Sequence, residues 1–450
     1  MRSKDVICVA ALVAIAGCAS GGATGSGTLP QTGSSVARAA RPRLPVLFSV
    51  QTFGTFGGSA SSAASINERG WITGSANLAG DSTAHASLWG DGPAKDLGTL
   101  GGPSSAIAWP NLNNFGLLAG VSETAAMDPY HEPWSCSAFF PALTPSLHVC
   151  VGFTWRNNVM QPLPTLGGPD GYAAGTNDWG NVVGWAEDTT LDPTCDNGQV
   201  LQFEPVIWDA RGRVHQLPTA AGDPDGAATA INDFNQIVGI SGICDQAVGR
   251  FTAKHVVEWE RGNVHLLFNL NSVSWNTPTA INQFGAVVGF INIPGPGDLA
   301  GNLQPIAFAW TRGGGLVKIP PLGTDAYSLA EGINDEGDVV GVSNGAGFAT
   351  ARAFIYHDGK TYDMNQLVPA GSPYLLAANA IDDRGDVVGQ ASTGSGELLA
   401  FEATPPWFDT GRRIKRSDVL HLSTVARKPI ALSAQQRFEL LKRYGVRYRR

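Results

Sequence analysis

Several features that would define a helical, membrane-spanning or metal-binding protein are missing from this sequence. Residues 46–403 show no convincing helical periodicity, which argues against a helical solenoid. The eight histidines form no His-x-x-x-His pair and the six cysteines form no Cys-x2-Cys pair, so we expect neither a bound metal nor a cofactor. Residues 19–410 are poor in Lys and Arg and carry a net charge of −19, which argues against nucleic acid as a partner.

Glycine and turn-forming residues, in contrast, recur in a fixed pattern. An eight-residue phrase begins with Asn or Asp, has glycine (once asparagine) in fourth place and ends with glycine. It occurs seven times, at residues 67–74, 113–120, 177–184, 232–239, 282–289, 334–341 and 382–389. The intervals between copies are 46, 64, 55, 50, 52 and 48 residues, and self-similarity at a period near 50 residues indicates a repeat architecture.

The phrase has the chemistry of a β-hairpin. In the copy from Asn334 to Gly341, Asn favours the first turn position and Gly337 supplies the left-handed backbone that closes the turn. The fourth copy has Asn235 instead, the residue next best able to adopt positive φ. A short β-branched strand such as Val339-Val340 follows, and the last glycine lets neighbouring backbones approach closely.

Two more strands recur in each period, one ending in an aromatic residue such as Trp89 and one leading into a Leu-Gly-Thr-Leu loop. Four short strands per period predict an all-β, seven-bladed β-propeller. The last period lacks its final strand, and residues 46–58 supply a matching segment, so we expect the strand near 46–52 to pair beside residues 398–401 and close the ring. Six or eight blades and an open β-solenoid remain as alternatives.

These phrases resemble the extracellular repeat family called HAF, named for a His-Ala-Phe sequence. The resemblance is carried by Leu97–Gly102, by Ile333–Gly341 and by His85-Ala86 with Trp89, although Ser87 stands where the family has Phe. It covers roughly residues 46–403 and implies an exported, β-rich repeat protein. It carries over no catalytic residue.

The first residues predict export and a lipid anchor. Arg2 and Lys4 precede an apolar run, Val6–Ala16, that is too short to span a membrane. The run ends in Ile15-Ala16-Gly17-Cys18, which resembles the lipobox cleaved before an acylated cysteine; an ordinary secretory signal is the alternative. By the same resemblance, Ala19 favours the outer membrane, facing the periplasm or the cell surface. The expected parts are a signal peptide (1–17), a flexible Gly/Ser/Ala tether (18–45), a propeller (46–404) and a basic tail (405–450).

The remaining cysteines fit an oxidising compartment. With Cys18 lipidated, Cys136, Cys150, Cys195 and Cys244 are left in the mature chain. The first two share one insertion, residues 122–150, and the other two follow corresponding strands of adjacent repeats. We therefore predict disulfides 136–150 and 195–244, with a zinc site as the alternative.

The C-terminal residues differ from the rest in charge and in periodicity. Residues 411–450 carry a net charge of +10, and Ser433 to Gln436 read as a capping box that starts a short helix. Phe438, Leu441 and Tyr444 would share one face of that helix. The positive charges could dock this helix on the acidic propeller, capping one face, or attract it to anionic lipid headgroups, and composition does not choose between the two. We expect a mobile or loosely docked basic tail whose partner is an envelope polyanion.

Candidate functional residues are few. Gly341-Val342-Ser343-Asn344-Gly345 matches a nucleophile elbow, yet its first glycine ends a repeat phrase, so coincidence is favoured. The tryptophans outside the repeat register are the better candidates for a ligand-facing surface. They are Trp71, Trp109, Trp134, Trp179, Trp185 and Trp275, of which we select Trp134, Trp109, Trp185 and Trp275 for binding a ligand such as a glycan.

The sequence therefore favours a non-enzymatic binding or scaffold protein of the cell envelope, with no catalytic residue assigned. The alternatives are a purely structural envelope protein and a carbohydrate-active or phosphoester enzyme with its site in the central channel. An enzyme would need carboxylates, or a histidine with a carboxylate, converging from different blades.

Overall fold

The computed structural model describes residues 47–90, 92–110, 112–132, 139–141, 146–193, 195, 198–245, 252–270, 275–299, 303–406 and 427–441. The predicted signal peptide, Cys18, the tether, Trp134, Cys136 and most of the basic tail lie outside these residues. Among the described residues, no helix has the length and apolar character needed to cross a membrane.

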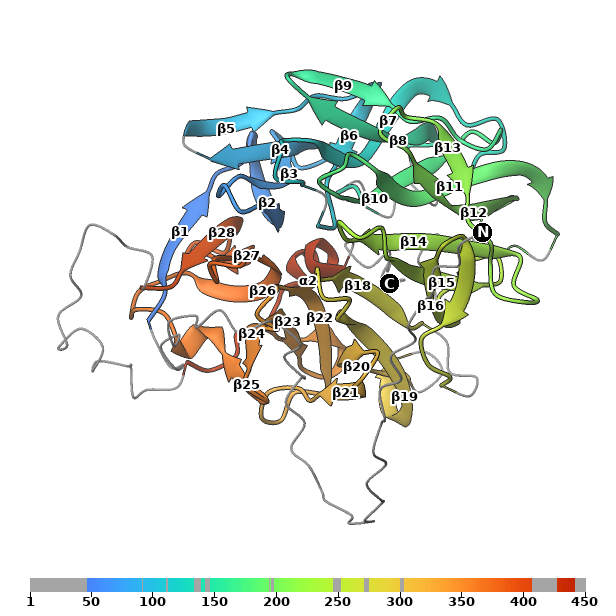
Figure 1. Ribbon diagram of the computed structural model, residues 1–450. Coiled ribbons are helices and arrows are strands. Elements are labelled where there is room, and N and C mark those ends of the chain that lie inside the picture. The colour runs from blue at the N-terminus through green and yellow to red at the C-terminus, as the bar shows by residue number, and fades with distance from the viewer. Residues whose placement is uncertain are drawn as a thin grey trace, which may run out of the picture.

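The described chain forms five four-stranded antiparallel sheets and one eight-stranded sheet, arranged in a ring (Figure 1). A parallel pairing of Ala60 with Leu398 joins two four-stranded units into the larger sheet, so the ring has seven blades around its centre. Blade 1 consists of β2 (Gly57–Ile66), β3 (Ile72–Leu78), β4 (Ala84–Gly90) and β5 (Gly92–Asp96). Blade 2 consists of β6 (Gly101–Ala106), β7 (Leu118–Met127), β8 (His148–Arg156) and β9 (Val159–Pro162). Blade 3 consists of β10 (Gly171–Thr176), β11 (Val182–Leu191), β12 (Leu201–Trp208) and β13 (Val214–Gln216).

The second half of the ring follows the same order. Blade 4 consists of β14 (Asp225–Ile231), β15 (Ile237–Gly242), β16 (His255–Glu260) and β17 (Asn263–Leu266). Blade 5 consists of β18 (Thr277–Ile281), β19 (Val287–Leu299), β20 (Leu303–Thr311) and β21 (Gly315–Ile319). Blade 6 consists of β22 (Tyr327–Ile333), β23 (Val339–Asn344), β24 (Ala351–His357) and β25 (Lys360–Asp363), with short 3-10 turns η1 (Ala346–Phe348) and η2 (Met364–Gln366).

Blade 7 joins the two ends of the propeller. Its strands β26 (Tyr374–Ile381), β27 (Val387–Ser392) and β28 (Leu398–Thr404) come from the C-terminal side, and β1 (Ser49–Phe53) pairs with β28 from Ser49 opposite Thr404 to Phe53 opposite Ala400. The predicted closure is confirmed. With β1 in place, β28 is paired on both sides rather than left as an open edge.

The seven phrase turns lie at one end of the channel, here called the turn end, and connect the two innermost strands of each blade. All seven fourth-place residues have positive φ, including Asn235 at 56°. The final glycine faces the bulged inner strand of its own blade: a Cβ on Gly184 would lie 1.9 Å from the carbonyl O of Tyr172. Only glycine permits that approach, as the sequence predicted.

The first residue of the phrase also links the blades, which the sequence did not reveal. The side-chain amide of Asn282 donates to the carbonyl O of Asn334 in the next blade (3.0 Å), while its own Oδ1 accepts from the backbone N–H of Ala286. Equivalent amide-to-carbonyl bonds start at Asn67, Asn113, Asn177, Asn232 and Asn334. Asp382 has no such donor, and Arg384 binds its carboxylate instead (Nε to Oδ2, 2.9 Å).

The second residue closes a complete ring around the turn end. Its backbone N–H donates to the side-chain oxygen of the second residue in the next blade, at 2.7–3.0 Å in all seven links. The residues in order are Glu68, Asn114, Asp178, Asp233, Gln283, Asp335 and Asp383. Because Asp383 donates to Glu68, the hydrogen-bond ring crosses the junction between blades 7 and 1.

The opposite end, here called the loop end, is closed by the C-terminal segment. Helix α2 (Ala434–Leu441) lies in the middle of the ring (Figure 1), and Leu440 and Leu441 are buried in the core that faces the channel. The capping box is confirmed: Ser433 Oγ accepts from the N–H of Gln436, whose Oε1 accepts from the N–H of Ser433. Of the face predicted for this helix, Leu441 is buried and Phe438 is half-buried, while Tyr444 lies outside the described residues. Leu440, which the prediction did not include, is buried as well.

Contacts outside the helix also fix this segment. Leu432 donates its N–H to Ala349 O (2.9 Å) and is buried. The guanidinium of Arg427 donates to Ser372 O (2.9 Å) and lies 5.3 Å from the ring centre of Tyr374. The expectation of a mobile or loosely docked tail is therefore wrong for residues 427–441, because the apolar contact is larger than the three residues we counted from helical periodicity.

Disulfides cross-link the loop end. Cys195 and Cys244 form the predicted bond between the connections of blades 3 and 4. Cys150 is also disulfide-bonded, and its predicted partner, Cys136, lies outside the described residues. Asp192 approaches Cys195 and Cys244 closely enough to suggest a metal site, but both sulfur atoms are consumed in the disulfide.

Candidate functional site

Three of the four tryptophans selected from the sequence lie in the channel-facing core. Trp109, Trp185 and Trp275 are at most 8% exposed, and Trp134 lies outside the described residues. The ring of Trp185 stacks on Tyr172 with 4.3 Å between centroids, and Trp109 lies 6.0 Å from Trp185. Trp275 packs edge-on against Phe290 at 5.8 Å. These described rings cover one another rather than a solvent-facing surface.

The aromatic residues of the recurring strand also pack inside, as the sequence predicted. Trp89, Trp208 and Trp259 are almost fully buried. The indole N–H of Trp208 donates to Pro164 O (2.7 Å) and that of Trp259 donates to Pro218 O (2.6 Å), each in the loop before the inner strand of its own blade. These rings fill the space between neighbouring blades and are not available to a ligand.

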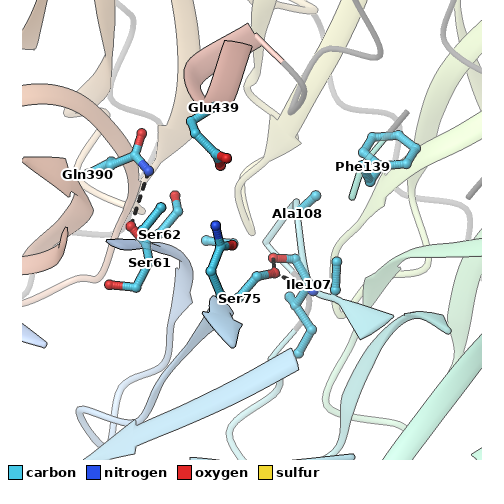
Figure 2. A pocket seen from close by; sticks show the side chains of 12 residues that line it. Ser61, Ser62, Ser75, Ile107, Ala108, Phe139, Gln390 and Glu439 are labelled. Atoms are coloured by element: carbon cyan, nitrogen blue, oxygen red, sulfur yellow. Dashed lines mark hydrogen bonds between the residues drawn. The ribbon is translucent and has the colours of Figure 1, made fainter. Parts of the chain in front are cut away.

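A small cavity lined by both apolar and polar side chains remains beside α2 (Figure 2). Its volume is about 40 Å³, enough for a few water molecules but not for a sugar or a phosphoester. Ser61, Ser62, Ser75 and Gln390 contribute from the blade walls, and Glu439 points toward the cavity from α2. Gln390 donates to Ser61 O (3.1 Å), so part of this polar lining serves the contact between blades 1 and 7.

Buried carboxyl groups gather at the loop end of blades 2 to 4. Burial raises the pKa of Glu204 to about 8, and the nearby charge of Asp225 adds to the rise. Burial also raises the pKa of Asp225 to about 7 and that of Glu132, in the 122–150 insertion, to about 7. Glu132 accepts from the N–H of Leu201 (2.8 Å) through Oε1. Such shifts are typical of functional acids, but buried structural acids show them too.

Ser343, the central residue of the nucleophile-elbow match, has a structural role. It lies fully buried in β23, its hydroxyl donates to Asp325 (2.7 Å), and the same oxygen accepts from the N–H of Leu322 (2.9 Å). Arg352 donates to the same Asp325 carboxylate, which completes a buried link between strands. This serine is not presented to a substrate, and the interpretation of the match as coincidence is supported.

The turn end presents an exposed aromatic surface. Position three of the phrase is occupied by Phe115, Trp179, Phe234 and Phe284 in the four consecutive blades 2 to 5. Their exposed fractions are 57, 69, 73 and 60%, respectively. Single exposed apolar residues are ordinary on protein surfaces, but four aromatic rings at the same place in four adjacent repeats form a pattern. We call these four residues the aromatic arc.

Neighbouring contacts hold the arc in place. The indole N–H of Trp179 donates to Asp233 O in the next turn (2.7 Å), although most of the side chain stays exposed. The guanidinium of Arg69, at position three of blade 1, lies 5.9 Å from the ring centre of Phe115. Trp71 reaches from blade 1 to the turn of blade 2, since a Cβ on Gly116 would lie 2.9 Å from its ring. Arg69 and Trp71 of blade 1 therefore contact the turn of blade 2, where the arc begins.

Acidic groups surround the arc. Burial raises the pKa of Glu68 to about 7, with the charges of Asp383 and Asp382 adding to the rise. Burial also raises the pKa of Asp233, while the hydrogen bond from the backbone N–H of Asp178 opposes the rise and the charge of the Asp178 carboxylate adds to it. Arg384 partly offsets this charge at the junction of blades 7 and 1 through its pairs with Asp382 (2.7 Å) and Asp386 (3.0 Å).

Three of the four arc residues were not among the candidates identified from the sequence. Phe115, Phe234 and Phe284 were not singled out because we looked for tryptophans that break the repeat register, whereas these residues obey it. Trp179 and Trp71 were among the six candidates but were not selected. The sequence did contain a signal for this surface. Position three is aromatic in four adjacent copies of the phrase, although a turn at this place is usually polar.

The fold and this arrangement define the class as a seven-bladed β-propeller. No protein-family model and no curated protein matches the chain. Among solved structures it is similar to virginiamycin B lyase from Staphylococcus aureus, with a TM-score of 0.46, 11% identity, and coverage of 79% of this chain and 99% of that one. It is also similar to a streptogramin B lyase, with a TM-score of 0.44, 13% identity, and coverage of 79% and 98%.

A more distant similarity is to an ulvan lyase of polysaccharide lyase family PL25, with a TM-score of 0.38, 11% identity, and coverage of 79% and 94%. At these identities the likeness concerns the fold and transfers no activity. Membership of the HAF-type repeat family stays a prediction from the sequence.

Proposed function

We propose that this protein is a lipoprotein of the cell envelope, anchored in the outer membrane through Cys18, whose propeller binds a ligand without transforming it. The observation that carries the proposal is the aromatic arc, a rigidly held and exposed apolar surface at one end of the ring. Such surfaces mark interaction sites because their exposure is unfavourable in the free protein. The lipobox-like sequence Ile15–Cys18 and the tether that follows it support the proposed location.

Two features of the described channel favour binding over catalysis. The segment 427–441 closes the loop end, and the cavity that remains beside it has room for only a few waters. The arc itself contributes aromatic rings and turn carboxylates whose oxygens accept backbone N–H groups of the neighbouring blades. These acceptors stabilise the ring and are less available as general acids or bases.

A carbohydrate-active or phosphoester enzyme is the second candidate. The observation that favours it is the raised pKa of Glu204, Asp225 and Glu132, which could keep a carboxyl group protonated at neutral pH. This candidate requires the loop end to open, because all three side chains are buried.

Fractionation and turnover assays test the proposal. The full-length chain should be found in the outer membrane, and Cys18→Ala should release it into the soluble periplasmic fraction. The released variant should form no product from neutral polysaccharide, uronate polysaccharide or a nitrophenyl phosphate beyond that of a heat-treated sample. Membrane retention of Cys18→Ala in high salt would contradict the anchor. Product formation that Glu204→Gln abolishes would favour the enzyme.

A further inference from the structure

We propose that the aromatic arc of Phe115, Trp179, Phe234 and Phe284 is a binding site for an unbranched, neutral glycan chain. This inference rests on the proposed binding function and adds the site and the ligand class.

The first step is the division of roles within the repeat phrase. Position one links the blades, position two completes the hydrogen-bond ring, position four supplies positive φ, and position eight faces the bulged strand. Position three has no shared structural role of this kind, because its side chain is Arg, Glu or aromatic in different blades. Arg69, Glu336 and Arg384 occupy it in blades 1, 6 and 7. The aromatic choice in four adjacent blades is therefore not required by the fold.

The second step is the spatial order of the rings. Each arc residue sits on a turn whose neighbours are joined to it by the bonds of positions one and two. The rings therefore occur once per blade along a curve, with the polar groups of Asn114, Asp178, Asp233 and Gln283 between them. An alternation of aromatic faces and hydrogen-bonding groups matches a chain of pyranose units, whose C–H faces stack on aromatic rings and whose hydroxyls donate to oxygen acceptors.

Third, the charge of the turn end narrows the class of ligand. Glu68, Asp178, Asp233, Asp335 and Asp383 lie in the ring at this end, against Arg69 and Arg384. An acidic surface repels uronate or sulfated polymers and nucleic acid, whereas a neutral saccharide pays no such penalty. Because the rings are separated by polar turn groups, the surface also lacks the continuous apolar core that a protein partner generally needs.

The fourth step concerns rigidity. In the phrase turn of blade 4, Asn232 Oδ1 accepts from the N–H of Phe234 (3.1 Å) and of Gln236 (3.0 Å), and the same turn is bonded to both neighbouring blades. The backbone under the ring is therefore fixed before a ligand arrives. Preorganisation lowers the entropic cost of binding, which matters for a ligand held by a few weak stacking contacts.

The experiment titrates the purified full-length chain with β-1,4-linked hexamers of glucose and of N-acetylglucosamine, by calorimetry and by tryptophan fluorescence. We expect a dissociation constant of about 0.1–1 mM for at least one hexamer, since a few stacked rings supply only modest affinity. Trp179→Ala combined with Phe234→Ala should weaken binding by about tenfold or more. Trp179→Phe should retain most of it, because the ring remains.

Tyr130→Ala is the matched control. Tyr130 is an exposed aromatic residue in the connection between β7 and β8, at the loop end, and its removal should leave the titration unchanged. Melting curves of all variants exclude unfolding as the cause of a loss. Phe115→Ala and Phe284→Ala, each with a smaller expected loss, provide further variants if the double substitution does not fold.

The outcomes separate this inference from the proposed function. No binding of either hexamer at about 5 mM would overturn the glycan site, while fractionation and turnover assays would still decide the envelope-binding function. Binding that the arc variants leave unchanged would overturn the site. Equal or tighter binding of a β-1,4-linked uronate hexamer, or binding of a Lys/Arg-rich peptide in place of the sugars, would overturn the ligand class. Loss restricted to the arc variants would support both site and class.

Discussion

The two ends of the channel are built by different means. At the turn end, the second residue of the phrase makes the same hydrogen bond between all neighbouring blades, and the third residue carries the exposed rings in four of them. At the loop end, connections of unequal length, disulfides and the segment 427–441 close the channel, and aromatic and carboxyl side chains are buried. Insertions on repeat scaffolds often carry function. Here the exposed aromatic surface lies instead on the regular end.

This difference shows where a repeat can vary at low cost. Positions that supply an inter-blade bond keep an oxygen-bearing side chain, and position four keeps a residue that accepts positive φ. The exposed side chain at position three meets neither demand, and it varies among arginine, glutamate and aromatic residues. At the loop end, residues of the longer connections are buried, as Glu132 of the 122–150 insertion illustrates through its bond from the N–H of Leu201.

The largest test of the comparison removes the segment that closes the loop end. A chain ending at residue 426 loses the buried side chains of Leu432, Leu440 and Leu441 and exposes the core they cover. We expect the melting temperature to fall by about 5–10 °C, from roughly 2 kcal/mol of lost burial per leucine. Leu441→Ala should give a smaller fall in the same direction. A truncated chain that melts like the parent would contradict the role of this segment in the fold.

A smaller test weakens one inter-blade bond at the turn end. Asn282→Asp keeps the oxygen that accepts from Ala286 N but replaces the amide that donates to Asn334 O. We expect a loss of about 1–3 kcal/mol in the free energy of unfolding, since a buried acceptor loses its donor. Asn158→Asp, in an exposed turn between β8 and β9, should change stability little. Equal effects of both substitutions in urea titrations would mean that the inter-blade amide bonds do not stabilise the ring.

The sequence predicted those parts of the fold that depend on local backbone chemistry. Gly337 and Asn235 revealed the turns because positive φ is available to few residue types. Counting the strands of the last period predicted the pairing of β1 with β28, and loop position in adjacent blades predicted the bond between Cys195 and Cys244. Each of these depends on spacing that the repeat makes visible.

The parts of the structure that the sequence did not predict depend on tertiary packing between side chains that lie far apart in the chain. Trp109 and Trp185 break the repeat register and were interpreted as ligand-facing. Trp185 instead stacks on Tyr172 of the neighbouring strand in its own blade, and Trp109 packs on both rings from blade 2, a contact that no spacing rule reveals. Leu440 is buried because α2 packs against core residues contributed by several blades, which no pattern within the helix reveals. The second role of Asn282 was also hidden, because its turn-capping role already explained the residue.

The test with the smallest expected effect compares how carboxyl groups at the two ends contribute to the pH dependence of stability. The pKa of Glu204 at the loop end is raised to about 8, so the folded protein holds a proton that the unfolded chain releases near its ordinary value. A raised pKa adds stability below the unfolded value, and this stability is lost as the pH rises through about 8. The melting temperature should therefore be higher at pH 5 than at pH 8, by a few degrees.

Glu204→Gln should flatten this dependence of the melting temperature on pH. Glu68→Gln, at the turn end, should flatten it less, because the pKa of Glu68 is raised only to about 7. A larger flattening from Glu68→Gln would place the main buried-charge penalty at the turn end and reverse the comparison.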